Sequence, residues 1–130
     1  MLGPFTHKKF IKIHDKIKAE KGNNMYIISF YVPPDHLEAV KTALFKKGAG
    51  RIGHYDACAW HTMGQGQFRP LTGSQPFKGE KNTIERSEEA RVDMVCKDDL
   101  LKAVLQELVR VHPYETPAYH AIHGVTLEDL

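Results

Sequence analysis

The chain has 130 residues, of which 42% are apolar and 26% are charged, with a formal net charge of +2. These values are ordinary for a soluble protein of one globular domain, and the charge is too small and too dispersed to indicate nucleic-acid binding. No apolar run approaches the roughly 20 residues of a membrane-spanning helix, so we expect no membrane partner.

Residues 1–24 precede the first clear strand pattern. They are rich in lysine, and Phe10, Ile13 and Ile17 recur near helical spacing. They lack the long apolar centre and small-residue cleavage site of a signal peptide. We predict an accessory arm with room for a short helix, while a membrane-surface helix is the alternative that the narrow apolar stripe disfavours. The domain itself is predicted over 25–130.

A first strand–helix–strand unit follows. Residues 26–32 are β-branched and aromatic and end at two prolines, which predicts a strand. A helix is predicted over 34–47, with Leu37, Val40 and Leu44 on one face. Residues 54–62 are predicted to form the second strand.

A long connection, residues 63–87, separates the two units. Its glycines and prolines predict a loop or a twisted hairpin. Phe68 and Phe77 would be costly to leave in water, so we expect them to pack on the domain or on a partner. Long connections of this kind are often functional, and Arg69 is a candidate for contact with an anionic ligand. A solvated or structural arginine is the alternative.

The second unit spans residues 88–125. Residues 88–96 alternate between apolar and polar, 97–111 carry a broad apolar helical stripe, and 118–125 supply a last strand. The two cysteines, Cys58 and Cys96, fall in predicted strands and form no C-x-x-C pair. We therefore expect reduced core thiols and a cytoplasmic location.

A shift of 64 positions brings the two units into register. Asp35 falls on Asp99, and the apolar helix residues Leu37, Val40 and Leu44 fall on Leu101, Val104 and Leu108. Two tandem units of this kind predict a ferredoxin-like β-α-β-β-α-β sandwich, an α+β fold whose antiparallel sheet carries two helices on one face. Apolar residues on the other face would favour a homo-oligomer.

Gly48, Gly50 and Gly53 have the G-x-G-x-x-G spacing of a dinucleotide-binding loop. That loop follows a strand and opens a helix, whereas these glycines follow a helix and lead into a strand. We therefore expect Gly48 to end the helix in a left-handed conformation and the other two to shape the turn. The three glycines and the adjoining His54 are kept as candidates for ligand contact.

The strongest candidate site is the loop "HPYETP", residues 112–117. His112, Tyr114 and Glu115 bring an imidazole, a phenol and a carboxylate together between two prolines. The structural alternative has His112 at the helix C-terminus and Tyr114 packed at an interface. A divalent metal held by His112 and Glu115, with His54 from another subunit, is a further hypothesis.

Four segments in order, "GAGRIGHYDACAW", "GQFRPLTGSQPF", "EEARVDMV" and "HPYETPAYH", carry a resemblance to a known family. Residues 25–123 resemble the YqfO-type domain of the Nif-three-like family, which is similar to CutA and to the PII signalling proteins. The resemblance implies trimeric assembly, ligand clefts between subunits and, for CutA-like proteins, an association with divalent metals. The dinuclear metal ligands of longer family members have no matching positions here.

These observations favour a non-catalytic, oligomeric sensor module that binds a small molecule or a protein. We expect a trimer, with a dimer as the alternative. A divalent-metal-binding CutA-like protein is one competing hypothesis. A small hydrolase that uses His112 or Glu115 as a general base is another, although no nucleophile or cofactor motif accompanies them.

Overall fold

The computed structural model describes residues 24–130, so the predicted arm lies, apart from Asn24, outside the described residues. The order of elements is β1 (Met25–Val32), α2 (Leu37–Lys46), β2 (Trp60–Phe68), β3 (Glu85–Lys97), α3 (Asp98–Val111) and β4 (Tyr119–Gly124). Short 3₁₀ turns, η1 (Pro34–His36) and η2 (Leu127–Asp129), precede α2 and follow β4. All neighbours in the sheet order β2-β3-β1-β4 are antiparallel, which confirms the predicted ferredoxin-like α+β fold.

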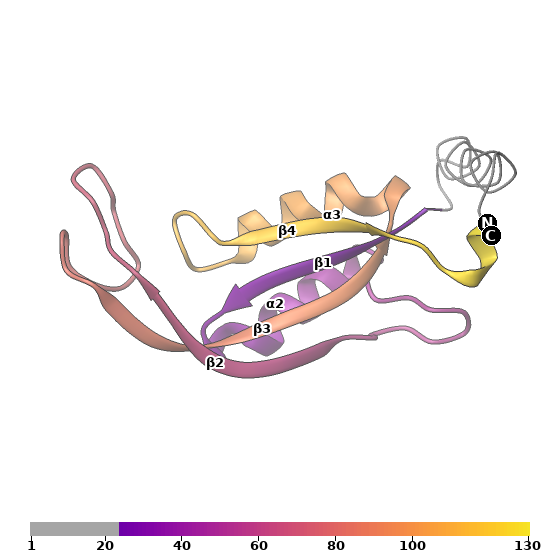
Figure 1. Ribbon diagram of the computed structural model, residues 1–130, viewed down its shortest axis with the longest axis horizontal. Helices are drawn as coiled ribbons and strands as arrows, with labels where there is room; N and C mark the ends of the chain where they lie inside the picture. The colour runs from indigo at the N-terminus through magenta and orange to yellow at the C-terminus, as the bar shows by residue number, and fades with distance from the viewer. Residues whose placement is uncertain (1–23) are drawn as a thin grey trace, which may run out of the picture.

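The core lies between one face of the sheet and the two helices, which cover the same face (Figure 1). Alternation along β1 and β3 directs Ile28, Phe30 and Val92 toward the helices, where they are fully buried. From the helices, the buried residues Val40 and Leu44 of α2 and Val104 and Leu108 of α3 pack into the same core. These are the residues that correspond to each other in the internal repeat. The repeat therefore marks the two halves of one shared core.

The second strand lies further along the chain than its sequence pattern predicts. The prediction of a strand over 54–62 is wrong for residues 54–59, which form a loop. Gly53 and His54 form a turn between Ile52 and Tyr55, which pair in an isolated bridge, and Ala57 has a φ angle of +53°, so the chain cannot continue as a strand there. β2 instead runs through Phe68 and pairs with β3 from Glu85 onward. The connection without regular structure is therefore 69–84, and the rest of 63–87 is a β-ribbon.

The glycines after α2 adopt the predicted left-handed conformations. The φ angles are +101° at Gly48, +78° at Gly50 and +57° at Gly53. A Cβ at Gly50 would stand 2.8 Å from both the Cys58 carbonyl oxygen and the Phe45 ring, whereas a Cβ at Gly53 would meet nothing within 4 Å. These glycines therefore serve the backbone of the helix-to-strand turn.

The second face of the sheet has no covering layer in the described chain. The β1–β4 register places Ile27 opposite Ile122 on this face, and Trp60 of β2 lies opposite Asp93 of β3 on the same face. Ile122 and Trp60 keep more than half of their surface exposed. We call this surface the open sheet face.

Candidate functional site

A cavity of about 540 Å³ lies between the 69–84 loop and the α3–β4 connection, at one end of the sheet. In Figure 1 these segments meet where the β2–β3 ribbon extends beyond β1. The side chains that matter to its chemistry are Phe68, Arg69, Phe77, Glu89, Tyr114 and Glu115. The structure thus gathers the predicted candidates Arg69, Tyr114 and Glu115 around one concave surface, and the volume is in the range of small-molecule sites.

Aromatic rings hold the long loop against the domain. The Tyr114 ring centroid lies 6.0 Å from that of Phe68 and 6.1 Å from that of Phe77. Phe77 also meets His36 edge-on, with the centroids 5.7 Å apart. Phe68 and Phe77 therefore pack on the domain itself, which was one of the two predicted alternatives, the other being a partner.

His112 lies beneath Tyr114 and is only 6% exposed. Its Nε2 donates to the Tyr31 carbonyl oxygen at 2.6 Å, and its Nδ1 accepts the Tyr114 backbone N–H at 3.1 Å. Burial lowers the pKa of His112, and the nearby His36 adds to this, while the bond to Tyr31 opposes it. Both ring nitrogens of the neutral imidazole are thus engaged in holding β1 and the loop together.

Glu115 ties the two loops together. Both of its carboxylate oxygens accept the backbone N–H of Gln75, at 3.1 and 3.2 Å. This contact joins residues 40 positions apart in the sequence and fixes the mouth of the cavity. In this structure the carboxylate therefore positions the loop.

Tyr114 is held as a neutral phenol. Its hydroxyl donates to a Glu89 carboxylate oxygen at 3.4 Å. Burial, followed by the charge of Glu89, raises the pKa of Tyr114. The Glu89 carboxylate reaches this position by lying across Gly66, where a Cβ would overlap it. Gly66 and Glu89 are site residues that the sequence analysis missed, since only the pairing of β2 with β3 brings them to Tyr114.

The glycine turn and His54 lie at the other end of the sheet. The Gly50 N–H donates to the Val95 carbonyl oxygen near the end of β3, whereas His112 contacts the far end of β1 (Figure 1). One copy of the chain therefore does not bring His54 to His112. Among residues 24–130, no three His, Cys, Asp or Glu side chains are grouped closely enough to hold a metal ion. The metal hypothesis would need a second copy and a released His112 nitrogen.

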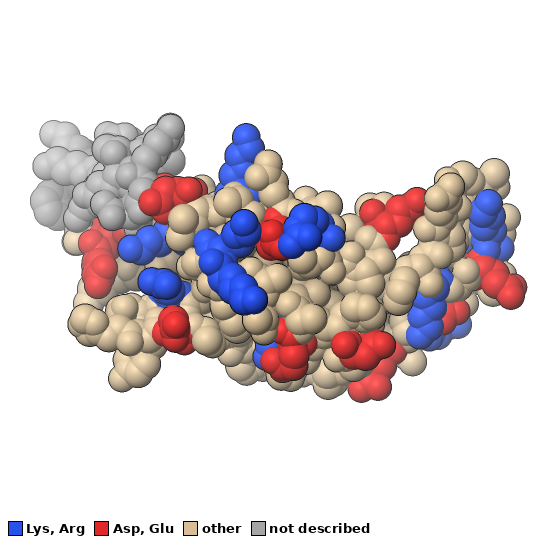
Figure 2. Space-filling model, turned by 180° about the vertical axis from the view of Figure 1, so that it is seen from behind, with Lys and Arg blue, Asp and Glu red and all other residues tan. Residues whose placement is uncertain are grey.

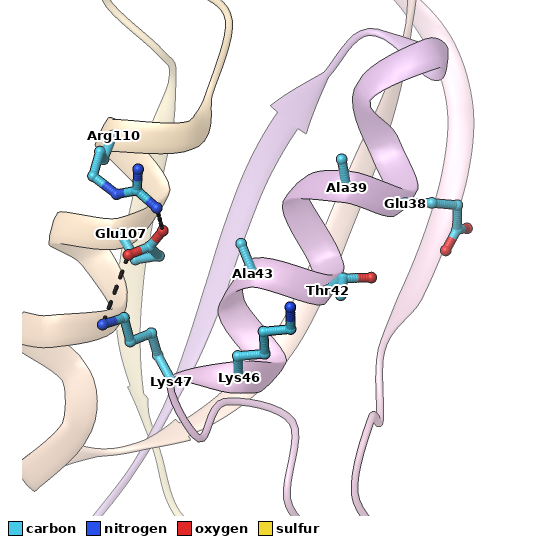
Figure 3. Close-up of a pocket in the computed structure, with 8 residues that line it drawn as sticks. All are labelled: Glu38, Ala39, Thr42, Ala43, Lys46, Lys47, Glu107 and Arg110. Carbon is cyan, nitrogen blue, oxygen red and sulfur yellow. Dashed lines mark hydrogen bonds and ion pairs between the residues drawn. The ribbon is translucent and has the colours of Figure 1, made fainter.

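A second concave surface, of about 610 Å³, lies between α2 and α3 on the outer side of the helix layer. Figure 2 views the molecule from this side, where basic side chains gather near the centre. In Figure 3, Lys47, which follows the end of α2, and Arg110 of α3 point at Glu107. Lys47 Nζ lies 3.9 Å from a Glu107 carboxylate oxygen, and Arg110 donates a hydrogen bond to Glu107 and lowers the pKa of that carboxyl. This ionised cluster links the helices and contains none of the predicted site residues.

Comparisons with known proteins identify relatives of this chain by sequence and by structure. No protein-family model matches the chain. The chain is 45% identical over 89 residues to the GTP cyclohydrolase 1 type 2 homolog of Mycobacterium leprae. The aligned residues cover 68% of this chain and 23% of that protein. The chain spans about a quarter of the length of the curated relatives it matches.

Solved structures give the same result. A Bacillus cereus protein related to NIF3 superposes with a TM-score of 0.69 and 29% identity, over 88% of this chain and 32% of that one. CutA1 from Shewanella sp. SIB1 superposes with a TM-score of 0.57 and 22% identity, over 78% of this chain and 82% of that one, a likeness that shows the fold alone. Within the described residues, none of the helices has the length and apolar character that crossing a membrane requires.

Proposed function

Because the chain is homologous to one segment of the Nif-three-like family, the GTP cyclohydrolase 1 type 2 homologs, we propose that it is a non-catalytic module that binds a small molecule. The binding site is the cavity between the 69–84 loop and the α3–β4 connection. The observation that carries this proposal is the concave surface itself, whose lining combines aromatic side chains with a small set of polar and charged ones.

The contacts of His112 and Tyr114 favour binding over catalysis. A general base must accept a proton from the substrate and must therefore have a free lone pair. Both His112 nitrogens are already hydrogen-bonded, so this imidazole has no free lone pair, whereas the Glu115 carboxylate accepts one backbone N–H from Gln75 and keeps further lone pairs. The raised pKa of Tyr114 keeps its hydroxyl protonated. His112 and Tyr114 are therefore held in contacts that stabilise the cavity, which is the role that the proposed binding function gives them.

We also propose that the module works as a homo-oligomer assembled through the open sheet face. Ile27 and Ile122 form an exposed apolar pair on that face, and Trp60 adds a large aromatic surface. Burial of such a surface is the usual reason for it in a small domain. A trimer is the expected state from the likeness to CutA-like folds. The two free cysteines suit the cytoplasm, where we place the protein.

Native mass spectrometry of protein purified without chelator tests both parts of the proposal. We expect a trimer with additional mass from a bound small molecule. Phe77→Arg should remove that mass, because Phe77 lines the cavity, whereas Tyr55→Arg, at an exposed aromatic at the other end of the sheet, should keep it. A protein that stays monomeric and bare, and binds nothing in a metabolite screen, would contradict the proposed function.

A further inference from the structure

Carboxylates dominate the charge around the cavity. The charged side chains that line it are Arg69, Lys78, Glu89 and Glu115. Lys78 Nζ lies 3.9 Å from a Glu85 carboxylate oxygen, which balances its charge. Within residues 24–130, Glu89 and Glu115 take part in no ion pair and accept hydrogen bonds only from neutral donors, a phenol and a backbone N–H. Two carboxylates therefore face one unpaired cation, Arg69, which is exposed to solvent.

A smaller hollow, of about 400 Å³, adjoins this cavity, and Phe77 and Tyr114 line both. It adds two further carboxylates, Asp35 and Glu88, and no further cation. Burial is the main cause of the raised pKa of Tyr114, and the charges of Glu89 and Asp35 add to it. The carboxylates therefore act on an aromatic ring that both hollows share.

Ser87 supplies an acceptor beside these carboxylates. The residue is buried in the lining of the smaller hollow, and its Oγ has no hydrogen-bond partner within residues 24–130. Ser87 pairs with Gly66 across the β2–β3 ribbon, and the Glu89 carboxylate lies across that same glycine. The unsatisfied hydroxyl and the Glu89 carboxylate are therefore neighbours. Buried hydroxyls are nearly always hydrogen-bonded, so this one calls for a polar group from outside the chain.

Phe77 leaves an apolar surface open next to these acceptors. Its ring contacts Tyr114 and His36, yet 55% of its surface is still exposed. Leu71, on the same loop, is 58% exposed and also lines the cavity. An apolar group packs on such a surface, and the face of an aromatic ring attracts a cation.

Resting on the proposed binding function, we propose that the ligand is a small primary amine in its protonated form, an ammonium ion that carries an apolar group. The ammonium donates hydrogen bonds to the Glu89 carboxylate and to Ser87 Oγ, and the apolar group packs against Phe77. A primary ammonium has three N–H donors and no acceptor, which matches a site where carboxylates and a free hydroxyl gather. An anionic ligand would instead meet the unpaired carboxylates.

Three probes separate the parts of this proposal by isothermal titration calorimetry on the full chain. They are 1-naphthylmethylammonium, the neutral 1-naphthylmethanol and methylammonium. We expect 1-naphthylmethylammonium to bind at least about tenfold more tightly than either of the others, since only this probe combines the ring with the charge. Equal binding of the two naphthyl probes would overturn the assigned charge, and equal binding of the two ammonium probes would overturn the apolar group.

Matched variants locate the contacts. Glu89→Gln should weaken 1-naphthylmethylammonium binding about tenfold and leave 1-naphthylmethanol unchanged, because the amide oxygen can still accept the Tyr114 hydroxyl but carries no charge. Ser87→Ala should weaken the ammonium probe about two- to tenfold. The control is Glu128→Gln, at an exposed carboxylate in η2 beyond the other end of the sheet, which should change neither probe.

The failure of this proposal differs from the failure of the proposed function. If Glu89→Gln and Ser87→Ala have no more effect than Glu128→Gln, the ligand class is wrong and the cavity still binds. If no probe binds, the ligand class is overturned as well. The proposed function then stands or falls on the bound mass in the native spectrum and its loss in Phe77→Arg.

Discussion

Replacement of His112 by phenylalanine separates a structural histidine from a catalytic or metal-binding one. The ring keeps about the same size, but the Tyr31 carbonyl oxygen and the Tyr114 N–H both lose their partner. β4 pairs with β1 only as far as Phe30, so on the β4 side of β1 no strand reaches Tyr31. The His112 imidazole donates to the Tyr31 carbonyl oxygen in place of that strand. A buried backbone group left unpaired costs about 1–3 kcal/mol, so His112→Phe should lower the free energy of unfolding by about 2–6 kcal/mol.

Urea unfolding at pH 7.5, followed by circular dichroism at one fixed protomer concentration, measures this loss. The control is His54→Phe, at an exposed histidine in the glycine turn, which should change the stability by less than about 0.5 kcal/mol. Equal stabilities of the two variants would refute the structural role of His112. A more stable His112→Phe protein would go further and point to a histidine kept for function.

The same histidine sets a pH dependence whose sign follows from its depressed pKa. The folded state holds His112 neutral, whereas the unfolded chain protonates it near pH 6.5. Its contribution to stability is therefore complete above about pH 6.5 and is lost as the pH falls toward the folded-state pKa. The wild-type protein should lose stability over that window, and the loss should be smaller in His112→Phe.

Two glycine pairs give the remaining predictions, each read by urea unfolding. Gly50→Ala should cost about 2–5 kcal/mol, from left-handed strain plus the clash at its Cβ, whereas Gly53→Ala carries only the strain of about 1–2 kcal/mol; equal costs would contradict the crowding at Gly50. Gly66→Ala should displace the carboxylate of Glu89 and reduce the bound mass in the native spectrum, while Gly64→Ala, in open space, should keep the bound mass and be neutral or stabilising by up to about 1 kcal/mol. Unchanged binding in Gly66→Ala would show that the carboxylate is not needed to hold Tyr114.

The helices and the strands β1 and β3 could be predicted because burial imposes periodicity on their sequences. β1 and β3 are central strands with one buried face, and the repeat at 64 positions records their two helices. β2 is an edge strand, and its residues from Trp60 to Gln65 are all exposed, so no alternation marks where it begins. Its length is set by pairing with β3, which is a long-range fact that a local pattern does not contain.

The candidate site was predicted only in part, because some of its contacts are also long-range. The "HPYETP" loop drew attention because it concentrates polar chemistry, and Arg69 because it lies in a long connection. The sequence could not reveal that the Glu115 carboxylate accepts the backbone N–H of Gln75. Nor could it reveal that the Glu89 side chain lies across Gly66 and accepts the Tyr114 hydroxyl. Those contacts depend on the extra length of the β2–β3 ribbon. The residues were therefore identified more readily than their roles.

The cavity and the open sheet face are built on the same strands. The cavity lies at the end of the sheet where the β2–β3 ribbon extends beyond β1. The open sheet face carries Ile27, Ile122 and Trp60, and Glu89 of the cavity projects from this face too, four residues from Asp93 along β3. A ligand in the proposed cavity would contact the ribbon at the Phe68 end of β2, while Trp60 lies at the other end of that strand. In the proposed function, ligand and neighbouring subunit would thus bear on one continuous strand, which is the physical connection that a sensor requires.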